Sequence, residues 1–418
     1  MKIGKYSLGI GDRFAHEGIA QLRAVQKAEE SGLNITPVWN KSNREHIITG
    51  TSPADTRLAA DAAVKALKWK TQYLVDADHI NLSNVDKFID SSDFITIDVA
   101  DYIGKQADKK AIDYFVDRNI KFIGKLSIQG INKPLEVTKH DLKNIASKYL
   151  LAISEAGKIY RHIESKKGAN NFVTEVSMDE IDTPQTPKEF LFILFLLAEQ
   201  NIPLQTIAPR FTGQFNKGVD YVGDVSKFAS EFEEFLMIIN YAVQEFGLPD
   251  NLKLSLHSGS DKFLIYPVIK NLLKKHNKGI HIKTAGTTWL EEMIGLALAS
   301  DETLNLAKSI YCESLSRINE LCLPYETVIN IDRKKLPSAD EVKKWNSEKF
   351  ANTLRHITNH PDYNPHFRQL IHVGYKVAAE YGKEFTSCLQ NYSDIIGEQV
   401  TENLFNRHIC RLFDLKTV

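Results

Sequence analysis

The stretch YLVDADHI, residues 73–80, begins with apolar side chains and then turns acidic. This order is typical of a buried parallel strand whose carboxyl end meets a functional site. Seven other short apolar segments also end in a polar residue that can do chemistry: YSLGIGDRF from Tyr6, ITPVWN from Ile35, FITIDVAD from Phe94, FVTEVSM from Phe172, LQTIAPRF from Leu204, LKLSLHSGSD from Leu252 and IHIKTAG from Ile280. In an eight-stranded barrel all carboxyl ends of the strands open onto one face. The sequence therefore predicts an α/β fold, a TIM-like (β/α)8 barrel with its active site on that face.

Apolar residues at helical spacing separate most of these segments. Helices are expected at 15–31, 56–67, 138–166, 187–197 and 225–246, and a polar loop at 40–51 follows the second strand. The long helix begins at Thr138 with Asp141 three residues later, a variant of the capping box.

Two regions exceed a plain barrel. Residues 119–137 resemble two strands joined by a turn at Gln129-Gly130-Ile131-Asn132, which we interpret as a hairpin excursion. The alternative is that this segment holds a genuine barrel strand and that one of the eight segments above is wrongly assigned. After the last strand, helix follows helix, and this tail goes beyond the roughly 250 residues of a standard barrel. We expect a barrel domain over residues 1–330 and a C-terminal helical extension over 331–418, packed on the barrel as a cap or a homo-oligomer surface.

The composition limits the partners and the compartment. The 418 residues include 52 basic and 53 acidic side chains, a net charge of −1, which gives no reason to expect nucleic acid or membrane as a partner. The start, MKIGKYSLGIGDRF, lacks a signal-peptide pattern, and the longest apolar run, FLFILFLLA from Phe190, is too short to span a membrane. The four cysteines have no CxxC spacing. We expect a soluble cytoplasmic protein.

Three segment ends carry residues suited to a metal or to proton transfer. Asp78 and His79 follow a buried strand, although strand alternation would place them on opposite faces. Glu175 lies within an apolar strand, where a carboxylate is costly unless it is paired or binds a metal. His257 ends another apolar alternation. Each has a structural alternative. Asp78 could cap a helix at the start of a loop, Glu175 could form a structural pair with an interior Arg or Lys, and His257 could be a core histidine bonded to a backbone carbonyl.

Cationic and polar residues at other strand ends suit an anionic ligand. Arg210 could clamp a carboxylate, and Lys283 stands where barrels often bind phosphate or carboxylate. Ser258 begins a turn that could point backbone amides at an anion, with Lys262 adding charge, and His372 in the tail could reach over the pocket. Gly9 and Gly11 lack the third glycine of a dinucleotide fingerprint.

Several of these runs together resemble one known family. GIGDRFAHEGIAQL, YLVDADHI, FITIDVADYIGK, TPQTPKEFLFILFLLA, IAPRFTGQFNKGVDYVGD, LSLHSGSDKF, IKTAGTTWLEE and RQLIHVGYKVAAE are similar to runs of the tagaturonate epimerases, from Gly9 to about Glu380. The resemblance implies a barrel-like fold and a metal-dependent interconversion of D-tagaturonate and D-fructuronate. It also implies that the uncharged ketoses tagatose and fructose can be substrates.

The chemistry of that reaction assigns roles to the strand-end residues. The two keto-uronates differ at a carbon β to the ketone, which enolisation cannot invert but retro-aldol cleavage and re-closure can. We expect His79, Glu175 and His257 to bind a divalent metal (Zn, Mn, Ni or Co), with Asp78, Asp12 and Glu175 as catalytic candidates. The residues expected to bind substrate are Arg210, Lys262, Lys283, Ser258 and His372. A metal-dependent aldolase of sugar acids and a non-catalytic sugar-acid binding protein are the alternatives.

Overall fold

The eight predicted segments are the eight strands of a closed parallel barrel. The computed structural model describes residues 1–257, 261–284 and 286–416. The strands are β1 (Tyr6–Gly11), β2 (Thr36–Ser42), β3 (Leu74–Ile80), β4 (Phe94–Asp98), β7 (Val173–Ser177), β8 (Leu204–Ala208), β9 (Lys253–His257) and β10 (Ile280–Lys283). They close in the order β1-β10-β9-β8-β7-β4-β3-β2, and all neighbours pair in parallel. The predicted TIM-like fold is confirmed.

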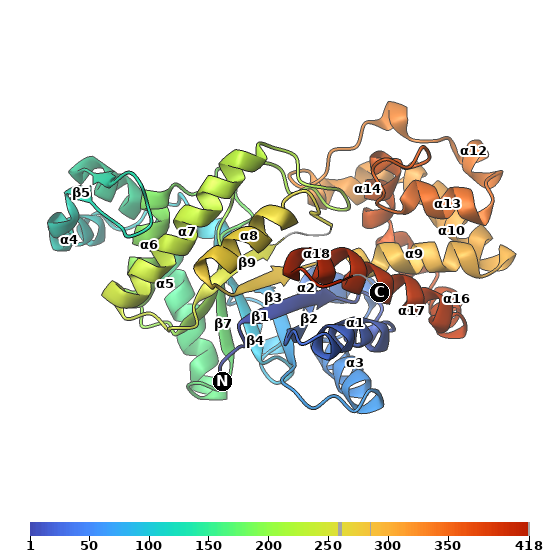
Figure 1. Ribbon diagram of the computed structural model, residues 1–418, viewed down its shortest axis with the longest axis horizontal. Helices are drawn as coiled ribbons and strands as arrows, with labels where there is room; N and C mark the ends of the chain where they lie inside the picture. The colour runs from blue at the N-terminus through green and yellow to red at the C-terminus, as the bar shows by residue number, and fades with distance from the viewer. Residues whose placement is uncertain (258–260, 285, 417–418) are drawn as a thin grey trace.

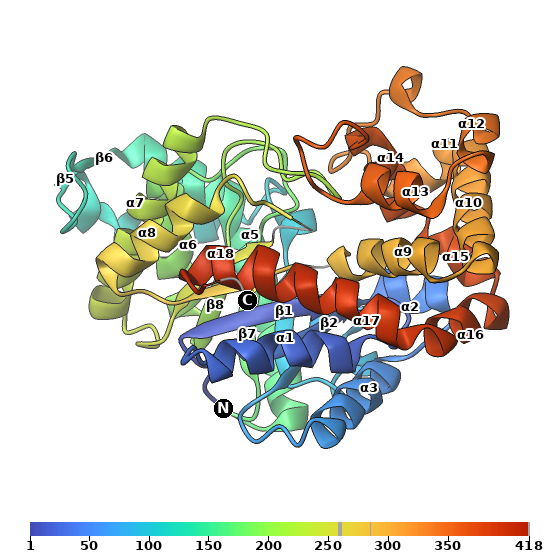
Figure 2. The same cartoon turned by 45° about the vertical axis from the view of Figure 1, so that its right-hand side comes forward.

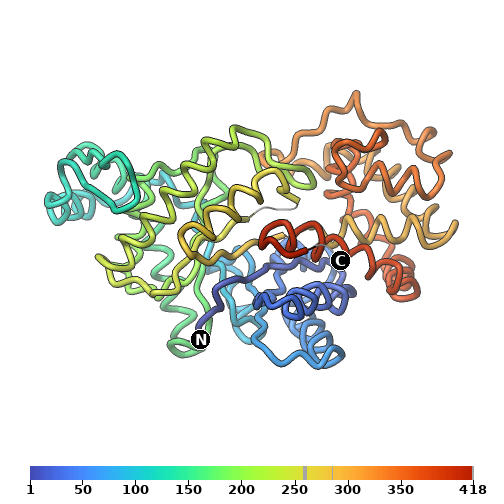
Figure 3. Tube along the Cα trace, in the orientation of Figure 1, coloured from blue at the N-terminus to red at the C-terminus, as the bar shows by residue number. Residues whose placement is uncertain are grey.

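Helices surround this barrel (Figures 1 and 3). They are α1 (Gly18–Glu30), α3 (Pro53–Ala66), α4 (Lys109–Arg118), α5 (Lys139–Lys167), α6 (Pro187–Glu199), α7 (Val225–Phe246) and α8 (Tyr266–His276). The capping box at Thr138 forms as predicted, because the Thr138 side chain accepts from the Asp141 amide and Asp141 accepts from the Thr138 amide. The all-round apolar α6 packs between α5 and α7.

The barrel interior is layered because alternate residues of each strand point inward. A separate apolar cluster, Ile3, Val38, Leu74, Phe94 and Val173, forms the layer at the amino-terminal ends of the strands. Two residues further along β3 and β7, the same faces carry Asp76 and Glu175, which are buried. The inner faces of the strands therefore change from apolar to charged toward their carboxyl ends.

The segment 119–137 leaves the barrel, as predicted. Strands β5 (Gly124–Leu126) and β6 (Leu135–Val137) form an antiparallel two-stranded sheet separate from the barrel. In Figure 2 this small sheet lies at one end of the molecule, beyond α6 and α7.

The prediction of a polar loop at 40–51 is wrong. Strand β2 continues to Ser42, and a helix, α2 (Asn43–Thr49), follows at once. The reason is local: the Ser42 and Glu45 side chains form a reciprocal capping box, and Gly50 ends the helix in the left-handed conformation. The hydrophilic composition hid a helix with good start and stop signals.

The chain after β10 is helical, as predicted. Its helices are α9 (Thr287–Ala299), α10 (Asp301–Ser316), α11 (Ile318–Cys322), α12 (Ala339–Lys343), α13 (Ser347–Leu354), α14 (Pro365–Val373), α15 (Tyr375–Glu380), α16 (Lys383–Asn391), α17 (Ser393–Glu402) and α18 (Cys410–Phe413), with a π-helical turn at Asn403–Ile409. Helices α9 to α15 form a body beside the barrel, and α17 returns across α1 (Figures 1 and 2). The domain boundary at residue 330 stays a prediction.

A buried polar network joins this helical body to the barrel. Asp261, four residues after the end of β9, is fully buried, and its carboxylate accepts from Arg368 at 2.8 Å. His408 Nε2 lies 2.9 Å and His356 Nδ1 lies 3.2 Å from the same carboxylate. Three separate tail segments therefore converge on one loop of the barrel. Among the described residues, no helix is both long and apolar enough to cross a membrane.

Candidate active site

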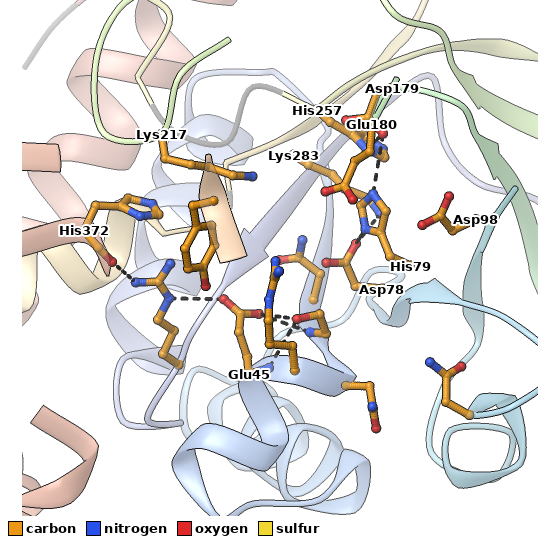
Figure 4. A pocket seen from close by; sticks show the side chains of 17 residues that line it. Glu45, Asp78, His79, Asp98, Asp179, Glu180, Lys217, His257, Lys283 and His372 are labelled. Carbon is orange, nitrogen blue, oxygen red and sulfur yellow. Dashed lines mark hydrogen bonds and ion pairs between the residues drawn. The ribbon is translucent and has the colours of Figure 1, made fainter. Parts of the chain in front are cut away.

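A polar pocket opens at the carboxyl ends of the barrel strands. Its volume is about 270 Å³. It is lined by residues at the carboxyl ends of β2, β3, β4, β9 and β10, by residues that follow β1, β2, β3, β7 and β8, and by Tyr325 and His372 from the helical region after the barrel. The volume is close to the lower end of the ~300–1,000 Å³ typical of ligand sites, which suits a small metabolite. Figure 4 shows acidic and imidazole side chains on one side of the pocket, and Lys217 and His372 on the other.

Two histidines and a carboxylate converge on the acidic side of the pocket. Asp179 Oδ1 lies 3.1 Å from His257 Nδ1 and 3.5 Å from His79 Nε2. One ligand atom from each of these three residues lies within 4.8 Å of the other two, so the group could hold a metal ion. His79 Nε2 is buried and, among the described residues, has no hydrogen-bond partner. A buried imidazole nitrogen of this kind fits a position that faces a cation.

A backbone irregularity brings His79 into the pocket. The pairing of β3 with β4 shifts between Ala77 and Ile80, and His79 has a φ of 53°, in the left-handed region. Strand alternation, which predicted opposite faces for Asp78 and His79, is therefore interrupted at this residue. A left-handed conformation is uncommon for a residue other than glycine, and such local strain often accompanies function.

A carboxylate stands behind each histidine. Asp78 Oδ1 lies 2.9 Å from His79 Nδ1, and Glu175 Oε1 lies 2.9 Å from His257 Nε2. These are the ring nitrogens that do not face Asp179. Metal-binding histidines almost always have such a partner on the far nitrogen, because it fixes the ring and raises its basicity. The structure thus puts Glu175 behind a histidine, and Asp179 in the group facing the pocket.

Lys283 links the carboxylates below the histidines. Its Nζ lies 2.7 Å from Asp76 Oδ2, 2.8 Å from Asp78 Oδ1 and 3.1 Å from Glu175 Oε1, and all four side chains are buried. Burial would raise the pKa of Glu175, but Lys283 and His257 hold it well below its usual range. Burial, only partly opposed by Lys283, raises the pKa of Asp76 to about 7.

The pKa values of the histidines follow from the same charges. Burial would lower the pKa of His79, but Asp78 raises it well above its ordinary value. Burial would also lower the pKa of His257, but Asp179 and Glu175 together raise it. Burial would raise the pKa of Asp179, but His257 and His79 hold it well below its usual range. The carboxylates around both rings thus favour positive charge at this position, and metal binding would have to displace any proton held there.

Of the other residues predicted for the site, some line the pocket and some do not. Lys283 and His372 line the pocket with Asp78, His79 and His257. Asp12 does not line it: its carboxylate accepts from the amides of Ala15 and Glu17 at 2.7 and 2.8 Å. Arg210 lines a neighbouring hollow that shares Asp179 and Glu180 with the pocket. Lys262 is buried beside the pocket, and Ser258 lies outside the described residues.

Asp179 is the main functional residue that sequence reasoning missed. It stands two residues beyond the end of β7, in VSMDE, where an apolar strand turns acidic as it does in VDADHI. The same signal could have found it. Asp98, Asn40, Arg13 and Lys217 also line the pocket without having been assigned a role.

The family model described as UxaE, tagaturonate epimerase, matches residues 1–412. The tagaturonate/fructuronate epimerase of Thermotoga maritima is 29% identical over 422 residues, covering 96% of this chain and 80% of that protein.

Solved structures agree in fold. The fructuronate-tagaturonate epimerase of Cohnella laeviribosi, in its complex with one glycerol, has a TM-score of 0.82 at 22% identity, covering 100% of this chain and 82% of that chain. The native crystal structure of the same enzyme has a TM-score of 0.79 at 22% identity, with the same coverage. At this level of identity, the likeness supports the fold alone.

Proposed function

The chain belongs to the tagaturonate epimerase family and is thus a carbohydrate epimerase, and we propose that it interconverts D-tagaturonate and D-fructuronate with the help of a divalent cation. The observation that carries the proposal is the pair of carboxylate-backed histidines, His79 and His257, that face Asp179 at the barrel mouth. A family match over residues 1–412 supports the substrate pair.

The residues of the pocket fit a divalent cation. We propose His79 Nε2, His257 Nδ1 and Asp179 as its protein ligands, with Asp78 and Glu175 orienting the two rings. When bound, the cation supplies Lewis-acid stabilisation of negative charge on the substrate oxygens. Imidazole and carboxylate ligands suit zinc, manganese, nickel or cobalt, so the donor set leaves the metal's identity open.

The proposed reaction is a retro-aldol cleavage followed by re-closure. Removal of the proton from the β-hydroxyl lets the bond between the α and β carbons break, giving an enediolate and an aldehyde. The aldehyde turns and the bond re-forms on its other face, which inverts the carbon. The buried ammonium of Lys283, held among three carboxylates, contributes fixed positive charge beside the site where this negative charge develops.

Asp98 is the carboxylate best suited to remove the proton of the substrate's β-hydroxyl and to return it. It lines the pocket, and burial raises its pKa even though the charge of His79 opposes the rise. A raised pKa favours a group that both takes and returns a proton near neutral pH. Asp78 and Glu175 are already engaged by a histidine and by Lys283, so we assign them positioning roles.

Product analysis tests the proposal. Purified protein, assayed for bound metal, is incubated with D-tagaturonate and followed by NMR, and D-fructuronate is the expected product. Two shorter fragments would instead indicate an aldolase, and an unchanged substrate would indicate a binding protein; either would refute the proposal. D-tagatose in the same assay tests the proposed activity on neutral ketoses. A cytoplasmic location and self-association stay predictions of the sequence.

A further inference from the structure

The side of the pocket opposite the histidines is basic. Lys217, on the loop between β8 and α7, and Arg13, after β1, line it together with His372 from α14. Arg13 is already paired: its Nε donates to Glu45 at 3.1 Å and its guanidinium lies 3.9 Å from the centre of the Tyr375 ring. The ammonium of Lys217, in contrast, makes no hydrogen bond or ion pair with any residue that the structure describes. Figure 4 shows Lys217 extending into the pocket toward the histidine side.

The loop that carries Lys217 is fixed by buried cations. Lys262 Nζ donates to the carbonyl oxygens of Asn216 at 3.0 Å and Val219 at 2.7 Å. Arg368 Nε donates to the carbonyl oxygen of Gly218 at 2.6 Å, and both cationic side chains are fully buried. The amide of Lys217 itself donates to Val328 at 2.7 Å. The backbone at Lys217 is therefore fixed before any ligand binds, which reduces the entropy cost of ordering this loop on binding.

His372 stands next to this loop with its ring unsatisfied. A Cβ on Gly218 would lie 3.5 Å from the Cβ of His372, so the loop and α14 are in contact. His372 is 1% exposed, and neither ring nitrogen has a hydrogen-bond partner among the described residues. Burial and the positive charges of Arg13 and Lys217 hold the pKa of His372 well below its ordinary value, so the ring is neutral and has one N–H to donate.

A buried amide lies in the same pocket. Asn40, on β2, is 2% exposed, and its side-chain nitrogen and oxygen have no partner within the described parts of the chain. Native proteins rarely keep an unsatisfied buried polar group without a ligand or water to satisfy it. An amide offers both a donor and an acceptor, which matches a sugar hydroxyl.

We propose that Lys217 and His372 bind the carboxylate of the sugar acid, and that Lys217 makes the enzyme prefer the uronate over the uncharged ketose of the same skeleton. This inference rests on the proposed function. In this arrangement the substrate carboxylate lies at the basic side of the pocket and the ketone end lies at the side of His79 and His257. Asn40 hydrogen-bonds to a sugar hydroxyl. This assignment also replaces the carboxylate-binding role predicted for Lys262, whose ammonium donates to the backbone of the Lys217 loop.

The test compares two ligands that differ in charge. Calorimetry on the metal-loaded protein measures the dissociation constants of D-tagaturonate and D-tagatose for wild type, Lys217→Met and Lys217→Arg. A charge-assisted hydrogen bond contributes about 1.5–3 kcal/mol, so Lys217→Met should weaken uronate binding by about 10- to 100-fold. The preference for the uronate over the ketose should fall by the same factor, and Lys217→Arg should keep most of it. Lys227→Met, an exposed lysine on α7, is the matched control and should leave both constants unchanged.

The outcomes separate this inference from the proposed function. Equal weakening of both sugars by Lys217→Met, an unchanged preference, or a wild-type protein that binds neither sugar would overturn the carboxylate site. A protein that binds D-tagaturonate through Lys217 but does not epimerise it would keep the site and refute the epimerase. His372→Leu is a second test. It should weaken uronate binding although the Lys217 loop keeps its hydrogen bonds from Lys262 and Arg368.

Discussion

Replacing Lys283 with methionine should invert the pH dependence of stability at the barrel mouth. In the wild type, Asp78 and Glu175 have pKa values well below their usual range, because Lys283 and the histidines outweigh burial. Groups with depressed pKa values contribute stability that is present above about pH 4.5 and is lost as the pH falls. The wild-type apo protein should therefore gain stability from these two groups between pH 3 and pH 5.

The size of the change follows from the charges that the substitution leaves behind. Without the ammonium that lies 2.8 Å from Asp78 and 3.1 Å from Glu175, these carboxylates keep only His79 and His257 as charged partners, so one buried carboxyl of the cluster must be protonated or keep an uncompensated charge. Protonating a carboxyl group of ordinary pKa near 4 costs about 4 kcal/mol at pH 7 but only about 1.4 kcal/mol at pH 5. Breaking a buried ion pair by removing one partner costs about 3–5 kcal/mol, in agreement with the protonation cost at pH 7. We expect Lys283→Met to lose about 4 kcal/mol at pH 7 and markedly less at pH 5.

Urea unfolding of the metal-free protein at several pH values, followed by tryptophan fluorescence, measures both quantities. Lys253→Met is the control, because Lys253 is also buried in the barrel but, among the described residues, donates to the backbone carbonyls of Gly4 and Lys5 and not to a carboxylate. Its loss should be about 1–3 kcal/mol and similar at pH 5 and pH 6. A Lys283→Met protein within about 1 kcal/mol of the wild type at pH 7, or equally destabilised at pH 5 and pH 7, would refute the reasoning.

Three further predictions concern the metal site and the basic wall. Asp179→Asn should abolish stoichiometric metal in the purified protein. Glu175→Gln should retain metal but bind it about 10- to 100-fold more weakly, as measured by competition with a chelator. Full metal affinity in both variants would exclude this ligand assignment. Removing the metal with a chelator should abolish epimerisation and lower the thermal midpoint, and one of zinc, manganese, nickel or cobalt should restore both, whereas full turnover after complete removal would contradict the proposal. Gly286→Ala should raise the KM for D-tagaturonate, because Gly286 has a φ of 86° and a Cβ there would overlap Nε2 of His372; an unchanged KM would show that His372 does not contact the substrate.

The fold could be predicted because its signals are local. Each strand is a short apolar run, and the ends of parallel strands necessarily meet on one face, so eight segments with polar ends were enough. Helix α2 was missed for a different reason: its sequence is hydrophilic, and only the Ser42–Glu45 capping box and Gly50 mark its ends.

The site was only partly predictable, because it depends on geometry that no residue spacing encodes. His79 and His257 meet because the barrel closes, but the turn of His79 into the pocket depends on a register shift in β3. Glu175 was recognised as a costly buried carboxylate, yet whether it faces the pocket or the back of His257 is decided by the side-chain packing. The Lys217–His372 pair joins segments that only the folded tail brings together.

The Asp261 network also sets when a newly made chain becomes complete. His79 emerges from the ribosome long before His408, whose ring is needed beside Asp261. At about 5–20 residues per second, the intervening synthesis takes on the order of 20–70 s. Until the tail has emerged, the buried Asp261 carboxylate lacks His356, Arg368 and His408, and α1 lacks the α17 helix that later covers it. Nascent chains should therefore acquire activity only once the last helices have left the exit tunnel, so a stalled chain ending before residue 400 would be inactive although all its barrel strands had been synthesised.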